Sequence, residues 1–142
     1  MQIAVRQVHG RIPVLAQSNH ASAKVAAEIA VKNESLGADM ISLALPRQFP
    51  IPEPDMLRYA ERVCRAVKRP VLLQDFNPGG ITIGAAFCQE LLNRCGNFLY
   101  IKLEEPMMGP KVRTIRDATG GELGVLEGWG GLYIAELFDF GI

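Results

Sequence analysis

Short apolar segments alternate with longer amphipathic segments along most of this chain. The apolar segments are predicted strands, and they cover residues 12–16, 40–44, 71–74, 99–103 and 123–127. After each of them, apolar positions recur with helical spacing. We therefore expect helices over residues 21–36, 54–67, 83–94, 110–118 and 128–140. Near-continuous apolar strands that alternate with amphipathic helices predict a parallel sheet with covered faces.

Turn and capping residues separate these elements. Gly37 ends the first predicted helix. Pro54 and Asp55 suit the first turn of the second helix, because proline is tolerated there and a carboxylate complements the helix dipole. A turn is expected at residues 77–80. The strands begin roughly 24 to 31 residues apart, which is the length of one strand–helix unit.

Two architectures accommodate five such units. A doubly wound, flavodoxin-like sheet of five strands would be complete at 142 residues. Five units of a (β/α)8 TIM barrel would form a partial barrel, because a complete one needs about 200 residues or more. Polar residues stand on nearly every predicted strand: Gln17, Ser42, Gln74, Lys102 and Glu127. A barrel lumen accepts such side chains from several strands, so the pattern favours a partial TIM barrel, with residues 1–142 as one domain.

Composition and charge exclude several classes of function. Fifteen basic and fifteen acidic residues balance, so we expect neither nucleic acid nor an anionic membrane as a partner. No apolar stretch reaches the roughly 18 residues of a membrane-spanning helix, and the N-terminus lacks a secretory signal pattern. The three cysteines and two histidines form no zinc-ligand motif. We expect a cytoplasmic protein with free thiols, no bound metal and no cofactor.

Lys102 lies in the middle of the fourth predicted strand and is the strongest candidate for chemistry. Side chains alternate along a strand, which assigns two faces: Leu99, Ile101 and Leu103 toward the helices, and Tyr100, Lys102 and Glu104 on the opposite side. Burial away from water favours a neutral amine, which forms Schiff bases with carbonyl substrates. The alternative is a lysine whose stem lies on apolar surface and whose head is solvated or paired with Glu104.

Several segments, in order along the chain, resemble the dihydrodipicolinate synthase/N-acetylneuraminate lyase family. Residues 10–16, 21–26 and 36–40 are similar to the family's third strand, the start of the following helix and the segment before strand four. Ile101-Lys102, with an acidic residue close behind, resembles the sixth-strand motif that carries the family's Schiff-base lysine. Residues 126–131 resemble the glycine-rich end of strand seven.

The resemblance implies a (β/α)8 barrel represented by its units three to seven. The family's second-strand motif, which holds the substrate carboxylate, would lie upstream of Met1, and the eighth strand would lie beyond Ile142. We therefore expect a truncated product or fragment with two exposed sheet edges. These edges and the resemblance together suggest a homo-oligomer.

The resemblance also implies an enzyme. Lys102 would attack the ketone of a 2-oxo acid, such as pyruvate or a sugar-derived keto acid. The resulting imine would serve aldol cleavage, aldol condensation or dehydration. An inactive fragment or a non-catalytic, flavodoxin-like binding domain is the alternative. Residues 16–22, after the first strand, contain no glycine and give little support to a phosphate-binding loop.

One departure from the family affects the mechanism. The family usually has a proton-shuttling tyrosine at the end of strand five, with an arginine in the next loop. Gln74 stands at that position here, and no arginine follows before Thr82. Glutamine forms hydrogen bonds but does not exchange a proton in this pH range. The chain therefore resembles a divergent Gln-Asp branch, whose substrate need not be that of dihydrodipicolinate synthase.

Four residues are candidates for the site. Lys102 is the catalytic nucleophile, and Glu104 is the preferred acid/base group, with a salt bridge to Lys102 as its alternative role. Gln74 is expected to bind substrate oxygens, and Gly128 to let the backbone approach the substrate. Asp75 falls on the opposite strand face from Gln74, which favours a helix-cap or turn role.

Overall fold

The computed structural model describes residues 1–78 and 80–142. Across these residues, five parallel strands pair in sequence order: β1 (Leu15–Gln17), β2 (Met40–Ala44), β3 (Val71–Asp75), β4 (Phe98–Leu103) and β5 (Gly124–Glu127). This sequential order is the winding of a barrel, whereas a doubly wound sheet reverses direction at a switch point. The partial TIM barrel is therefore confirmed, and the flavodoxin-like alternative is wrong.

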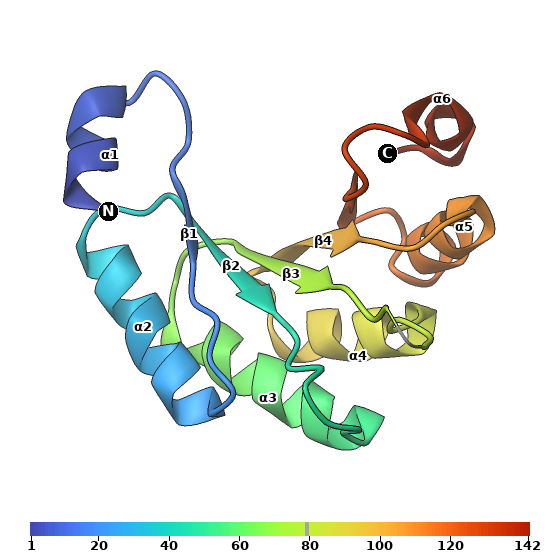
Figure 1. Cartoon of the computed structure of the whole chain (residues 1–142), viewed down its shortest axis with the longest axis horizontal. Coiled ribbons are helices and arrows are strands. Elements are labelled where there is room, and N and C mark those ends of the chain that lie inside the picture. Colours follow the sequence, from blue (N-terminus) through green and yellow to red (C-terminus); the bar gives the residue numbers. More distant parts are fainter. Residues whose placement is uncertain (79) are drawn as a thin grey trace.

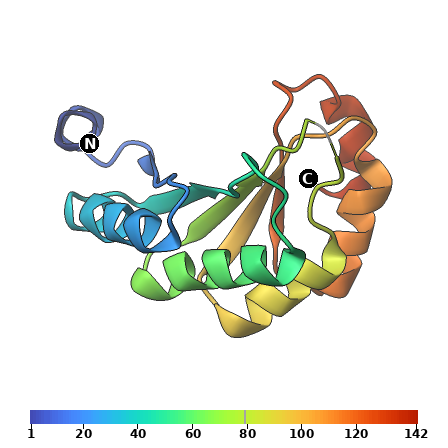
Figure 2. The ribbon, with the colours of Figure 1, turned by 60° about the horizontal axis from the view of Figure 1, so that its bottom comes forward.

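The sheet curves into a trough whose convex side carries the connecting helices (Figure 1). These are α2 (Ala23–Ser35), α3 (Glu53–Ala66), α4 (Ala85–Arg94) and α5 (Gly109–Ala118). Figure 2 shows them side by side around the outside of the strands. The hydrophobic core fills the layer between strands and helices, and it includes Ile41, Leu73, Ile101, Val63 and Leu91. Among the described residues, no helix covers the concave side of the sheet (Figures 1 and 2).

Helix α3 illustrates why these segments fold as they do. Pro54 lies in its first turn, where no backbone N–H is needed, and acidic residues precede and follow it. The buried side chains recur at helical spacing along one face: Met56, Tyr59, Ala60, Val63 and Cys64. Full burial of a side chain the size of valine or methionine contributes about 1.5–3 kcal/mol. This stripe therefore fixes the helix against the sheet.

Strand β4 contains a bulge that interrupts the alternation of side chains at its start. Val71 of β3 pairs with Phe98, but the next residue, Leu72, pairs with Tyr100. Leu99 is thus an extra residue, and it is only half-buried, whereas Phe98 lies in the core. The predicted faces are confirmed from Tyr100 onward, and Leu99 also lies on the predicted helix-facing side, beside Leu92 of α4 and Ala118 of α5.

The two ends of the chain differ from the prediction. Helix α1 (Gln2–Val8) was not predicted. The last predicted helix is shorter than expected: α6 covers Ile134–Leu137, and a 3-10 turn, η1, covers Phe138–Phe140. Gly130 and Gly131 have φ values of 69° and 83°, so the backbone there is left-handed and cannot begin an α-helix.

Two further expectations concern the rest of the chain. The turn expected at residues 77–80 includes Gly79, which lies outside the described residues; beside it, the Gly80 N–H donates to the Asn77 carbonyl at 3.2 Å. Within the described ranges, the helices are all too short or too polar to cross a bilayer.

Candidate active site

The carboxyl ends of β3 and β4 bring three of the predicted site residues together. Gln74 pairs directly with Lys102 across the two strands, so both side chains emerge on the concave side. Lys102 Nζ lies 2.8 Å from Glu104 Oε1. Gln74 Nε2 donates to the same oxygen at 2.6 Å. One carboxylate oxygen therefore receives both the ammonium and the amide.

The exposure of this cluster suits a reactive group. The Lys102 side chain is 34% exposed and that of Glu104 is 14% exposed, so the amine is accessible from the concave side while the carboxylate is largely shielded. No hydrogen bond reaches Glu104 Oε2 from the described residues, and none of their buried side-chain oxygens lacks a partner. Oε2 therefore remains open to solvent or to a bound molecule.

The ion pair between Lys102 and Glu104 is the alternative that we weighed against an acid/base role for Glu104. The two roles are geometrically compatible. A carboxylate in hydrogen-bond contact with an amine is within the range needed to exchange a proton with it. The same contact therefore pairs the Lys102 ammonium with a carboxylate and provides the route by which Lys102 can lose its proton.

Gly128 sets the position of Glu104. Its N–H donates to the Leu103 carbonyl at 2.8 Å, which brings the chain after β5 against the end of β4. A Cβ at this position would lie 2.3 Å from Glu104 Cγ and 2.6 Å from the Leu103 oxygen. Only glycine therefore fits without moving the carboxylate.

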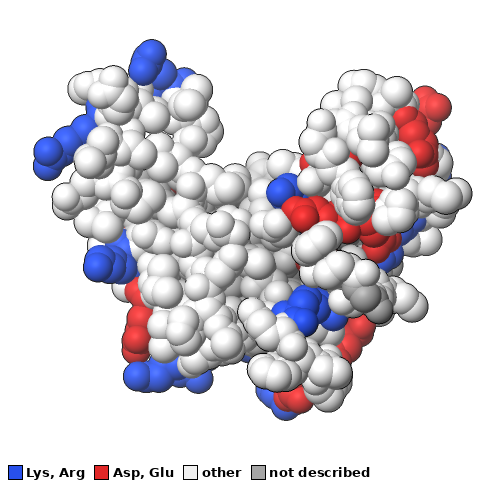
Figure 3. Space-filling view, viewed as in Figure 1, with Lys and Arg blue, Asp and Glu red and all other residues white. Residues whose placement is uncertain are grey.

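The concave surface below Lys102 is mainly apolar. The strand register places Leu72, Tyr100 and Leu126 on the same side as Lys102. The Tyr100 ring lies over Gly124, where an added Cβ would come within 2.7 Å of it. Figure 3 shows that charged side chains are scarce in the middle of this side. Such surroundings reduce the number of water molecules that can solvate an ammonium group.

Asp75 occupies a different environment, although it follows Gln74 directly. It is fully buried and forms two bonds with Arg47, from Nε at 2.9 Å and from Nη2 at 2.6 Å. The Ile83 N–H donates to it at 2.6 Å. Asp75 therefore anchors the loop before α4, in agreement with the turn role predicted for it.

The sequence reasoning missed Arg47. It is the only charged residue between Ala44 and Glu53, in a segment otherwise made of prolines, apolar residues and one glutamine. This isolated cation was the one signal in the sequence that could have pointed to the pair with Asp75.

A second ionic network, also missed, holds the same loop from its other side. Lys111 Nζ lies 2.8 Å from Glu105 Oε1, and the Thr82 hydroxyl donates to Glu105 Oε2. Lys111 also donates to the buried Thr82 hydroxyl oxygen. The segment between β3 and α4 is thus fixed at Thr82 and at Ile83.

Glu127 was expected in the lumen, and this prediction was wrong. It pairs with Leu103, whose side chain faces the helices, so it lies on the convex side of the sheet. Its two carboxylate oxygens accept the N–H groups of Trp129 at 2.8 Å and Gly131 at 2.6 Å. Glu127 therefore organises the glycine-rich turn. Gln17 and Ser42 pair with each other on the concave side, as predicted.

Among the described residues, no group of three or more His, Cys, Asp and Glu could hold a metal ion. The three cysteines are free and buried. Burial raises the pKa of the Cys88 thiol to about 12, whereas a hydrogen bond from Cys64 lowers the pKa of the Cys95 thiol to about 7. All three lie on or next to the helices of the convex side, away from Lys102.

Known proteins resemble this chain in both sequence and fold. The model of the Dihydrodipicolinate synthetase family matches residues 1–138. L-2-keto-3-deoxyarabonate dehydratase of Azospirillum brasilense is 30% identical over 115 residues, which cover 78% of this chain and 37% of that protein.

Two solved structures superpose on almost the whole chain. Dihydrodipicolinate synthase of Aquifex aeolicus gives a TM-score of 0.90 at 20% identity, over 99% of this chain and 47% of its own. YagE of E. coli K12, solved in complex with pyruvate, gives 0.84 at 24% identity, over 99% and 48%. The chain thus spans about half the length of these structures, and less of the dehydratase.

Proposed function

Since the chain belongs to the dihydrodipicolinate synthetase family, we propose that it carries the Schiff-base lysine of an aldolase- or dehydratase-type lyase acting on a 2-oxo acid. The family resemblance seen in the sequence is confirmed by this match. The observation that carries the proposal is the position of Lys102, with its amine on the concave side at the carboxyl end of β4 and 2.8 Å from Glu104. In TIM-barrel enzymes the active site lies at this end of the strands.

The proposed reaction begins at the Lys102 amine. After the ammonium gives its proton to Glu104, the nitrogen lone pair bonds to C2 of the 2-oxo acid, and the carbonyl oxygen takes up a proton. That proton comes from the nitrogen, and a second one, returned by Glu104, lets the oxygen leave as water, which gives an iminium ion and restores the Glu104 carboxylate. Its positive nitrogen accepts the electron pair released when a proton leaves C3, or when the C3–C4 bond breaks.

Glu104 is the group we propose for proton transfer. In dehydration, its carboxylate takes the C3 proton and returns it to the C4 hydroxyl as that group leaves. One molecule of water is thereby lost, with no net change at Glu104. Gln74 cannot exchange protons, but its amide bond to Oε1 at 2.6 Å orients the carboxylate and leaves Oε2 for the substrate. Gly128 supports the same position by leaving room for Glu104.

For the substrate we propose a sugar-derived 2-oxo acid and dehydration as the reaction. A relative of this chain is named for dehydration of a keto-deoxy sugar acid, and YagE was solved with pyruvate, which is a 2-oxo acid. The absence of a tyrosine at residue 74 also separates this chain from the family pattern implied for dihydrodipicolinate synthase.

Borohydride reduction in the presence of pyruvate tests the proposal. An imine on Lys102 would be reduced to a stable secondary amine, and mass spectrometry of the digested protein would locate it. Lys102→Met removes the expected adduct, whereas the same substitution at the exposed Lys24 leaves it in place. A well-folded protein that gives no adduct, or an adduct only at other lysines, contradicts the proposal and leaves a non-catalytic chain as the reading.

We also propose that residues 1–142 form one domain that assembles into homo-oligomers in the cytoplasm. Large apolar side chains remain exposed on the two outer strands, at Leu15 and Leu126. The free thiols of the buried cysteines suit a reducing compartment. Light scattering of the purified protein measures the mass of the assembly, and a monomer at all concentrations rejects this part of the proposal.

A further inference from the structure

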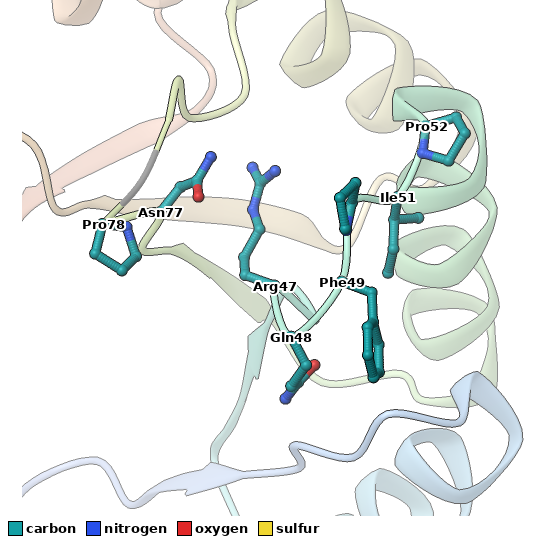
Figure 4. A pocket seen from close by; sticks show the side chains of 8 residues that line it. Arg47, Gln48, Phe49, Ile51, Pro52, Asn77 and Pro78 are labelled. Carbon is teal, nitrogen blue, oxygen red and sulfur yellow. The ribbon is translucent and has the colours of Figure 1, made fainter.

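A cavity of about 670 Å³ lies between the loop after β2 and the loop after β3 (Figure 4). Arg47, Gln48, Phe49 and Ile51 line one side of it, and Asn77 and Pro78 line the other. None of these residues belongs to the Lys102, Glu104 and Gln74 cluster. The cavity is therefore a separate feature of the same end of the sheet.

The cavity lies close to the proposed reaction centre. Ala44 of β2 pairs with Gln74 of β3, which pairs in turn with Lys102 of β4. Adjacent strands are about 4.8 Å apart. Asn77 follows Gln74 by three residues, so their Cα atoms are at most about 11 Å apart. The cavity therefore lies at the same carboxyl end of the strands as Lys102, over the two strands that precede β4 in the sheet.

Arg47 supplies unused hydrogen-bond donors to the cavity. A guanidinium group has five N–H donors, and Asp75 accepts one from Nε and one from Nη2. The structure gives no acceptor in its described residues to the other three. No buried side-chain nitrogen there lacks a partner, so Nη1, which has none, is solvent-accessible. Figure 4 shows the guanidinium between Asn77 and the segment of Ile51 and Pro52.

The charge of Arg47 is already neutralised. Asp75 is fully buried beneath it and binds it through both carboxylate oxygens, so a second carboxylate or a phosphate gains little attraction here. Asn77 Nδ2 donates to the Ile81 carbonyl at 2.9 Å, which leaves its side-chain oxygen as an acceptor. Gln48 is exposed and adds an amide with both functions. The cavity thus offers donors and acceptors without net charge.

We propose that this cavity is the subsite for the uncharged, hydroxylated tail of a sugar-derived 2-oxo acid. Each hydroxyl group both donates and accepts a hydrogen bond, which matches the mixed lining. The side chains of Phe49 and Ile51 provide apolar surface for the C–H groups of the tail. The inference rests on the proposed function and assigns the part of the substrate that lies away from Lys102.

Binding of acids without a ketone tests the subsite separately from the chemistry, because they cannot form an imine. Dissociation constants are measured by NMR for L-arabonate, which has a hydroxylated tail, for lactate, which has none, and for L-arabinarate, whose tail ends in a second carboxylate. L-arabonate is expected to bind at least about fivefold more tightly than either, the order of one or two net hydrogen bonds. Resonances of the Gln48 and Asn77 side-chain amides should shift only with L-arabonate.

Two variants locate the effect. Gln48→Leu removes an exposed amide, and Arg47→Lys keeps a cation over Asp75 but removes the fork of donors. Each is expected to abolish the preference for L-arabonate over lactate, whereas Gln7→Leu on the exposed side of α1 retains it. Equal affinity for L-arabonate and lactate, or a preference that survives in either variant, overturns the subsite.

Borohydride trapping with pyruvate separates the two proposals. A Lys102 adduct without any preference for L-arabonate rejects the subsite and retains the lyase. A preference for L-arabonate without an adduct retains the subsite as a sugar-acid binding site and rejects the Schiff-base chemistry.

Discussion

Two carboxylates at the ends of neighbouring strands have opposite surroundings. Asp75, at the end of β3, is fully buried and accepts bonds from Arg47 and from the Ile83 backbone. Glu104, just after β4, presents one oxygen to Lys102 and Gln74 and keeps the other free. The first site has no room for a ligand, whereas the second faces the open side of the trough. A carboxylate is available for chemistry when its protein partners leave part of it unused.

The largest expected effect concerns the open pair, Lys102 and Glu104. Lys102→Met removes the only atom that we propose to bond to the substrate, so turnover should fall by roughly 10⁴-fold or more. The unfolding midpoint should change little, because a pair whose lysine is one-third exposed contributes modestly to stability. Single-turnover kinetics and urea denaturation measure the two quantities. A large loss of stability with residual activity would reverse the assignment of the two sites.

The buried pair, Arg47 and Asp75, should respond in the opposite way. Asp75→Asn leaves the Arg47 charge without its counter-ion, which is expected to cost about 3–5 kcal/mol of unfolding free energy. Urea denaturation measures it, and Glu28→Gln, in the exposed pair of Glu28 with Lys24, is the matched control. Borohydride trapping at Lys102 should persist in Asp75→Asn under conditions where the protein is folded. An unchanged unfolding free energy would contradict the structural role of Asp75.

Glu104→Gln separates the two functions of the open pair. The side chain keeps its shape and its bond to Gln74, but it can no longer take up a proton. The Lys102 adduct with pyruvate should form more slowly, because Glu104 no longer takes the ammonium proton, and turnover of the full substrate should fall by about 10²- to 10⁴-fold. If turnover is retained, another group transfers the proton and Glu104 only pairs with Lys102.

Gly128→Ala perturbs the open pair by shape alone. The new Cβ would overlap Glu104 Cγ and the Leu103 carbonyl, so the carboxylate must move. We expect a loss of about 1–3 kcal/mol in stability and a reduced turnover. Gly96→Ala is the control, since a Cβ there meets no atom within 4 Å. Equal behaviour of the two variants would show that Glu104 does not depend on Gly128.

The smallest expected effect concerns an acidic group outside both sites. Hydrogen bonding to Arg94 lowers the pKa of Glu61 on α3. The carboxylate therefore stabilises the fold above the unfolded-state pKa of about 4.3, and this contribution is lost as the pH falls through the lower folded-state value. Glu61→Gln should flatten the acid limb of the stability profile and leave the adduct at Lys102 unchanged. Thermal unfolding between neutral and acid pH measures it.

Local pattern was sufficient to predict much of the fold. The apolar segment at 40–44 became β2 with the same bounds. A short, nearly continuous apolar run is typical of a strand that is buried inside a parallel sheet. The faces of β4 followed from simple alternation after Tyr100, which placed Lys102 and Glu104 on the same side. These features depend on residues that are near one another in sequence.

The features that were missed depend on how distant segments meet. Arg47 and Asp75 are 28 residues apart, and only the pairing of β2 with β3 brings them together. The bulge at Leu99 is visible only from the register with β3. Glu127 was assigned by its polarity, but the register with Leu103 puts it on the convex side, where backbone N–H groups satisfy it. Tertiary pairing decided each of these cases.

The bulge in β4 also has a consequence for changes in chain length. Leu99 is an extra residue at the start of the strand, so the alternation that directs Lys102 to the concave side begins at Tyr100. A deletion at Leu99 would restore plain alternation from Phe98 and keep the amine where it is. A residue inserted between Tyr100 and Lys102 would rotate the lysine into the helix layer, and every position after it would change sides.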